Sequence, residues 1–266
     1  MQINWLLLTE GPGGVPVPTY GNYGGPNWSG GEFVGDDEPG NYTVRPEDPL
    51  DALFRRHDKA YDQPDTLLRA KADLQLIKGI LKQSPDAVTG EGDLYAGGAV
   101  LAMLYQIAVV NGHPELLARV DVHEIVESAI DRIEEGSITP EPQEVAALAT
   151  WLQQTAALLA ARNEPALTFA AEKLLELSTK LDGTDNPTIP VDLTDDAFAF
   201  AFGGTDARVE DVTDRIADVI ADTWSPKALT DFASSHGEAL AAVQEHVLEI
   251  VPKKLGLHFD FGDFGF

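Results

Sequence analysis

The chain has 266 residues, of which 44% are apolar, so it holds enough material for a substantial buried core. It has no cysteine, which excludes disulfides and thiolate metal sites, and its net charge of −26 argues against nucleic acid as a partner because such a surface repels phosphates. No apolar stretch is long enough for a transmembrane helix.

The first 46 residues are rich in glycine and proline, which favours a loop stabilised by packing or by a bound ion. The apolar patch 5–8 has no basic residues before it and is too short for a secretory signal peptide. Localisation therefore stays open, and secretion would need a route other than an N-terminal signal peptide. The acidic, aromatic C-terminus 256–266 fits either an edge strand or a C-terminal export signal.

Two helices are predicted next, separated by a turn at Pro64-Asp65. Asp48 is a suitable N-cap and Pro49 suits the first helical position, so the first helix runs to about residue 62. The second helix runs over 65–83, with leucines and isoleucines at helical spacing. A short turn between them predicts an antiparallel helix pair.

The rest of the chain is also predicted to be mostly helical. Apolar periodicity, often with proline in the first turn, predicts helices over 94–110, 114–135, 142–162, 165–181, 209–224 and 226–250. The fold class expected is all-α: an antiparallel helix pair with a loop before it, followed by an acidic helical bundle. The expected divisions are 1–90, a helical region 91–181, a linker 182–206 and C-terminal helices with a tail 207–266.

The negative charge is concentrated after the helix pair. Residues 1–82 contain 12 acidic and 8 basic residues, whereas residues 83–266 contain 32 acidic and 10 basic ones. A surface of this kind gives solubility or adaptation to a salty medium, or it binds a basic protein partner.

Candidate chemistry lies in the helix pair. His57 and Tyr61 are four residues apart and share a helix face, while Asp58 points in another direction. Asp73 lies as far after Asp65 as His57 lies before it, so antiparallel packing would bring Asp73 to His57 and Tyr61. An imidazole oriented by a carboxylate can act as a general base.

Asp58 would instead face the glycine-rich run 20–31, upstream of the helices. Glycines let a backbone curl so that several carbonyls converge on one point. One carboxylate with converging carbonyls forms an oxygen cage of the kind that calcium prefers.

At these residues the chain resembles the phospholipase A2 superfamily, namely the secreted calcium-dependent enzymes and their cysteine-free parvoviral relatives. The family's calcium loop has the pattern Tyr-Gly-x-Tyr-x-Gly, and its active-site helix has an Asp six residues before a His-Asp pair and a Tyr four residues after the His. The matching residues are Tyr20, Gly21, Tyr23 and Gly25 in the loop, Asp51, His57, Asp58 and Tyr61 in the first helix, and Asp73 in the second. The resemblance covers about residues 18–82.

The resemblance implies calcium-dependent hydrolysis of the sn-2 ester of glycerophospholipids at a membrane surface. In this interpretation His57 activates water, Asp73 orients His57, and Tyr61 holds Asp73. The implied calcium ligands are Asp58 and the backbone carbonyls of Tyr23, Gly25 and one residue from Asn27 to Gly30. The family's cysteines are replaced here, so no disulfide can fix the loop to the helix.

Two other functions stay open from the sequence. Residues 18–82 could form a calcium-binding or protein-interaction module without turnover, or the acidic C-terminal helices could be the functional part and bind a partner. For an enzyme that works on membranes, residues 5–8, Tyr20, Tyr23 and Trp28 are expected to form an apolar rim near the loop.

Overall fold

The computed structural model describes residues 3–11, 16–35, 38–84, 87–88, 90–161, 165–181 and 189–190. This part of the chain is mainly helical with a few short strands, which confirms the coarser prediction of a mostly α-helical fold. The helices predicted over 209–224 and 226–250, nearly all of the linker and the C-terminal tail lie outside the described residues.

The elements follow one another with short connections. The α-helices are α1 (Pro49–Tyr61), α2 (Thr66–Leu81), α3 (Gly90–Tyr105), α4 (Val122–Glu135), α5 (Val145–Ala160) and α6 (Pro165–Lys180). A π-helical turn, η3 (Gln106–Val110), continues α3, and a 3-10 helix, η4 (Pro114–Arg119), precedes α4. Strands β1 (Ile3–Glu10) and β2 (Pro16–Tyr20), β3 (Trp28–Ser29) and β4 (Glu32–Phe33), and β5 (Ser137–Ile138) and β6 (Ile189–Pro190) form three antiparallel pairs.

The prediction of a loop over residues 1–46 was wrong for the first part of that segment. Strands β1 and β2 form a hairpin in which Leu8 pairs with Pro18 and Glu10 with Pro16. The two prolines are two residues apart, so they occupy equivalent positions of the ladder. Each strand of an antiparallel pair donates to its partner only from alternate residues, so prolines at the other positions remove no ladder hydrogen bond. Proline content therefore did not prevent a strand here.

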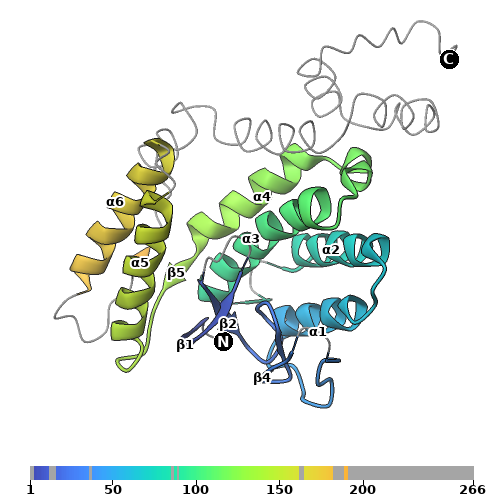
Figure 1. The fold of residues 1–266 in the computed structure, drawn as a ribbon, viewed down its shortest axis with the longest axis horizontal. Coiled ribbons are helices and arrows are strands. Elements are labelled where there is room, and N and C mark those ends of the chain that lie inside the picture. Colours follow the sequence, from blue (N-terminus) through green and yellow to red (C-terminus); the bar gives the residue numbers. More distant parts are fainter. Residues whose placement is uncertain are drawn as a thin grey trace, which may run out of the picture.

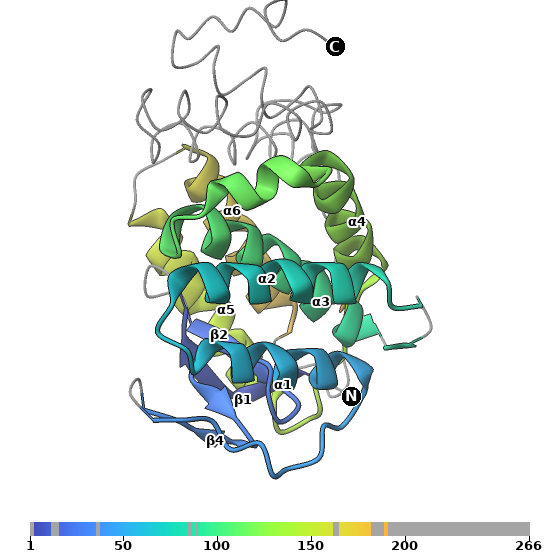
Figure 2. The ribbon, with the colours of Figure 1, turned by 90° about the vertical axis from the view of Figure 1, so that its right-hand side faces the viewer.

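The antiparallel helix pair forms as predicted, and its ends follow from local chemistry. Asp48 caps α1 by accepting a hydrogen bond from the Asp51 N–H, with Pro49 at the first position. Asp65 caps α2 in the same way through the Leu68 N–H. Figure 2 shows α1 and α2 lying side by side across the molecule.

The single helix predicted over 114–135 is divided in two. Val120 is extended, and Asp121 caps α4 by accepting a hydrogen bond from the Glu124 N–H. An Asp followed three residues later by a Glu is a helix start signal, so the break could have been predicted from the sequence.

The helices form two groups on either side of the β1–β2 hairpin (Figure 1). One group contains α1 to α4 and the other is the α5–α6 pair, which contacts the hairpin through Trp5 and Trp151. The Trp151 indole donates a hydrogen bond to the carbonyl of Pro16 at 2.7 Å. One continuous cluster of buried apolar residues includes members before and after position 90.

Glu91 connects the start of α3 to two distant segments. Its buried carboxylate accepts hydrogen bonds from the Ile3 N–H and the Thr139 N–H, both at 2.7 Å. The N-terminal hairpin is therefore fixed to the helical core by a charged group, which bonds two backbone donors at once.

The apolar rim expected from residues 5–8, Tyr20, Tyr23 and Trp28 was wrong for its four aromatic members, because Trp5, Tyr20, Tyr23 and Trp28 are all buried. Their large apolar area explains this, since burial stabilises the fold more than exposure at the surface would. Leu6, which belongs to the expected range 5–8, and Phe33, which was not expected, are the large apolar side chains exposed in the described part of this region, each at 56%. No helix in the described part of the chain is long and apolar enough to cross a bilayer.

Candidate active site

The α1–α2 pair brings His57 and Asp73 into contact. The His57 Nε2 lies 2.7 Å from Asp73 Oδ1, and the Asp73 side chain is fully buried. A carboxylate is an acceptor only, so the hydrogen bond requires the proton on Nε2 and leaves Nδ1 as the acceptor nitrogen of the neutral ring. The spacing of the two residues about the turn at Pro64-Asp65 therefore predicted this contact correctly.

Tyr61 joins the same pair from the next turn of α1. Its hydroxyl donates to Asp73 Oδ1 at 2.6 Å, and its ring lies beside the His57 ring with centroids 4.3 Å apart. Asp73 Oδ1 is thus shared by two donors, which fixes the carboxylate relative to both α1 side chains.

Asn111 also belongs to this group, although nothing in the sequence pattern predicted it. Its Nδ2 donates to Asp73 Oδ2 at 2.7 Å and to the Tyr61 hydroxyl oxygen at 3.1 Å. Asn111 follows the π-helical turn η3, at 38 residues from Asp73 in the sequence. No local periodicity connects the two positions, so only a family alignment or a structure could have revealed the contact.

The surroundings of His57 change its affinity for protons in two opposite ways. Burial lowers the pKa of His57, whereas the neighbouring carboxylates of Asp58 and Asp73 raise it, and the net effect is a pKa above the usual value. A raised pKa makes the neutral ring a stronger base, provided that the pH is high enough to keep it neutral.

Asp58 lies on the other side of the His57 ring, and its position is unlike that of Asp73. Its Oδ1 is 3.9 Å from His57 Nδ1, which is too long for a direct hydrogen bond, and its Oδ2 is buried without a hydrogen-bond partner. Burial raises the pKa of Asp58 to about 6, against the opposing effects of His57 and of the nearby Ser29 hydroxyl. The Ser29 hydroxyl oxygen is also buried, and although it is near Asp58 it does not meet hydrogen-bond geometry with any group in the described part of the chain.

The loop before α1 is held to the helix by hydrogen bonds to Asp51. The Asp51 carboxylate is fully buried and accepts hydrogen bonds from the backbone N–H groups of Tyr23 at 2.8 Å, Asn22 at 3.1 Å and Glu47 at 2.9 Å. Gly21 has a φ of +56°, and a Cβ atom there would lie 2.5 Å from the Asp51 carboxyl carbon. Glycine at this position is therefore required for the close approach of loop and helix.

The loop curls through several left-handed residues. Positive φ angles occur at Gly21, Gly25, Gly30 and Gly31, and at one non-glycine residue, Asn27, with φ of 54°. Such residues let consecutive carbonyls turn toward a common centre, as an oxygen cage requires.

The hydrogen bonds of the loop separate the carbonyls that are engaged from those that are not. Among the described residues, the carbonyls of Gly24 and Asn27 accept bonds from Tyr20 and Val34 at 2.8 and 2.9 Å. The Gly25 carbonyl accepts a longer bond of 3.3 Å from the Trp28 N–H, and those of Tyr23 and Gly30 accept none from a backbone N–H in the described part of the chain. Of the four candidate carbonyls, those of Tyr23, Gly25 and Gly30 thus have more acceptor capacity left than that of Asn27.

A metal site in this region would need backbone oxygens. Within the part of the chain that the structure describes, no three His, Cys, Asp or Glu side chains group closely enough to hold an ion by themselves. Calcium fits the local donor set, because it accepts carbonyl, hydroxyl and carboxylate oxygens, and because Asp58 Oδ2 and the Ser29 hydroxyl are buried with no other partner.

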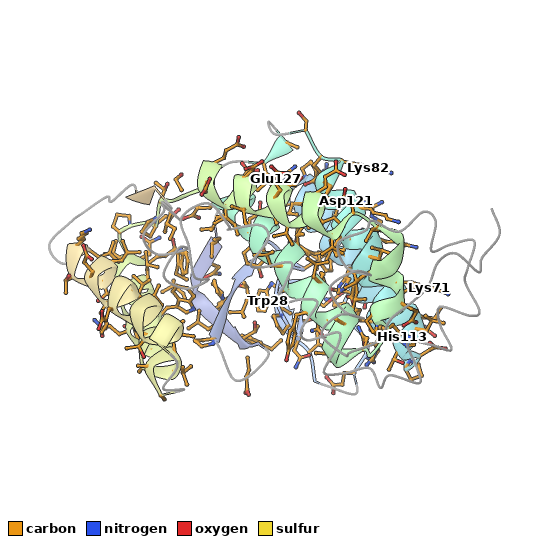
Figure 3. All side chains as sticks on the ribbon, turned by 90° about the horizontal axis from the view of Figure 1, so that it is seen from above. Trp28, Lys71, Lys82, His113, Asp121 and Glu127 are labelled. Carbon is orange, nitrogen blue, oxygen red and sulfur yellow. The ribbon has the colours of Figure 1, made fainter. Side chains whose placement is uncertain are left out.

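The indole of Trp28 supports the loop from inside. Its Nε1 donates to the Gly21 carbonyl at 3.0 Å, and Phe33 packs edge-on against it. Figure 3 shows Trp28 near the middle of the molecule beside the strands, and His113, close to Asn111 in sequence, out among the helices.

No protein-family model, curated protein or solved structure matches the chain.

Proposed function

We propose that the protein is a calcium-dependent phospholipase A2-like hydrolase, which cleaves the sn-2 ester of glycerophospholipids with water activated by His57. The observation that carries this proposal is the pair of unlike carboxylates around one imidazole. Asp73 bonds His57 Nε2 at 2.7 Å, and Asp58, on the Nδ1 side, keeps a buried oxygen without a partner.

His57 would act through Nδ1. Because Nε2 carries the proton that bonds Asp73, Nδ1 is free to accept a proton from a water molecule. The imidazolium that forms is stabilised by the buried Asp73 carboxylate, and Tyr61 and Asn111 keep that carboxylate in place. No serine or cysteine nucleophile is needed.

Asp58, together with the carbonyls of Tyr23 and Gly25 and that of Gly30 or Asn27, would hold calcium. The bound ion would supply positive charge that polarises the ester carbonyl and stabilises the oxyanion. Asp58 is suited to this role because its buried Oδ2 has no hydrogen-bond partner among the described residues.

The loop has no disulfide, so its calcium affinity should be modest, with a dissociation constant of about 10⁻⁴ to 10⁻³ M. The test is hydrolysis of a fluorogenic phospholipid with millimolar calcium and with excess EGTA. Hydrolysis that is lost in EGTA and restored by calcium supports the proposal, and full activity in EGTA contradicts the role of calcium.

A calcium-binding module without turnover is the competing function. It predicts calcium binding by calorimetry with no release of fatty acid from any phospholipid offered. A protein that binds no calcium and hydrolyses no lipid would contradict both functions. Binding of a partner by the acidic C-terminal part would then be the remaining hypothesis.

A further inference from the structure

The buried carboxylate of Asp73 is surrounded by three donors. Oδ1 accepts from His57 and Tyr61, and Oδ2 accepts from Asn111 at 2.7 Å. Asp73 has no exposed surface, so water does not solvate its charge. The three side-chain donors take the place of that water. Asn111 is the donor on the Oδ2 side.

The second contact of Asn111 closes a ring of hydrogen bonds. Its Nδ2 also lies 3.1 Å from the Tyr61 hydroxyl, which itself donates to Asp73. An amide nitrogen has two hydrogens, and here each has one acceptor. The reverse amide orientation would place Oδ1 against the carboxylate, so this geometry defines the amide as a donor.

The π-helical turn η3 delivers Asn111 to this place. The Asn111 N–H donates to the Gln106 carbonyl at 2.8 Å, five residues back, and Gly112 comes next with φ of +69°. Each residue on a helix advances the side-chain direction by about 100°, so a one-residue expansion redirects the side chains after it. Such turns are rare and occur frequently at functional sites.

We propose that Asn111 is a positioning residue that holds Asp73 and Tyr61 in one arrangement and thereby sets the tautomer and orientation of His57. The effect on turnover rests on the hydrolase function proposed above. The effect on the His57 tautomer rests on the hydrogen bonds alone, so the two can fail separately.

The test compares Asn111→Leu, which keeps the side-chain size but removes both donors, with Thr66→Val as the matched control. Thr66 is bonded to His113 at 3.0 Å, so the control also removes a link between α2 and the turn after η3, but one that does not involve Asp73. Circular dichroism and thermal unfolding establish that each variant is folded. Asn111→Ala is the second variant if Asn111→Leu does not fold.

The first measurement is nitrogen-15 NMR of the imidazoles in EGTA, with the His57 signals assigned by their loss in His57→Gln. The wild type and Thr66→Val are expected to show a single Nε2-protonated tautomer with a strongly hydrogen-bonded N–H proton. Asn111→Leu is expected to weaken that proton signal and to mix the tautomers. This measurement needs neither calcium nor substrate.

The second measurement is steady-state hydrolysis of a soluble short-chain phospholipid. Loss of a hydrogen-bond partner behind a catalytic group typically costs about tenfold or more, so kcat should fall by that factor in Asn111→Leu while KM changes less than about twofold. Calcium affinity by calorimetry should not change. Thr66→Val should match the wild type in all three.

An unchanged His57 tautomer in a folded Asn111 variant would overturn the proposal, and so would failure of both variants to fold, since Asn111 would then be a structural anchor only. If no chain hydrolyses lipid but the tautomer changes as expected, the positioning role stands and the hydrolase function fails.

Discussion

The two sides of the His57 ring differ in how well their oxygens are satisfied. On the Nε2 side, both oxygens of Asp73 have donors, supplied by three side chains. On the Nδ1 side, Asp58 Oδ2 and the Ser29 hydroxyl are buried with no hydrogen-bond partner among the described residues. One side is a complete hydrogen-bond network and the other lacks the groups needed to complete it.

This difference separates the side of the ring that positions His57 from the side that could bind a ligand. A complete buried network rigidifies the residues that form it, whereas buried oxygens without partners are costly unless something outside the chain compensates them. In the proposed function, the compensating group is calcium on the side where substrate and water would also meet.

The largest effect is expected from His57→Gln, because it removes the base but leaves Asp58 and the loop intact. General base catalysis contributes about 10² to 10⁴ in rate, so kcat should fall by about that range while calcium affinity by calorimetry stays unchanged. His113→Gln is the matched control, as His113 bonds Thr66 and Glu115. Equal losses in both variants would remove His57 from the chemistry.

Asp51→Ala tests what holds the loop beside α1. The change leaves three backbone N–H groups without their buried carboxylate, which should lower the free energy of unfolding by about 3 kcal/mol. Urea denaturation measures this, and Asp121→Ala, which removes only the cap of α4, should cost about 1 kcal/mol. Similar decreases in the free energy of unfolding for the two variants would mean that Asp51 does not hold the loop beside α1.

Asp58→Asn should raise stability in EGTA and abolish the stabilisation by calcium. The folded pKa of about 6 lies above the ordinary value of 3.8, so the folded state binds this proton more tightly than the unfolded chain. As the pH rises from about 4 through 6, ionisation of Asp58 therefore lowers the free energy of unfolding of the wild type by about 2 kcal/mol. Asn at this position does not ionise, so the variant keeps that stability.

The measurement is the free energy of unfolding of both proteins in EGTA at pH 4.5 and 7.5. The gap between variant and wild type should be larger at pH 7.5. A variant that is less stable than the wild type at pH 7.5 in EGTA would show that Asp58 already has a compensating partner in the chain.

Phe33→Ser should give the smallest effect, and it tests whether the loop side faces lipid. Phe33 is 56% exposed beside Trp28, and burial of its free surface in a bilayer would contribute about 1 kcal/mol, or about fivefold in vesicle binding. Leu175→Ser, on α6 in the other helical group, is the control. Equal vesicle binding by wild type and Phe33→Ser would exclude Phe33 from the contact.

The helix pair was predictable because its signals are local. Asp48 and Asp65 mark the two helix starts, and the distance from His57 to Asp73 follows from the turn between them. Asn111 was not predictable, because its contact with Asp73 depends on a π-helical turn that leaves no periodic pattern. The β1–β2 hairpin was missed because prolines were interpreted as loop signals, although the ladder accommodates them.

The Glu91 carboxylate has a consequence for how the chain folds. Its bond to Ile3 closes a separation of 88 residues, and the bond from Trp151 to Pro16 closes one of 135. Contacts this distant in sequence form slowly, because the chain must lose conformational entropy before the contacts stabilise the fold. We expect the hairpin, and the loop that continues from it, to reach the helices late, so that stopped-flow calcium binding would follow the last folding step.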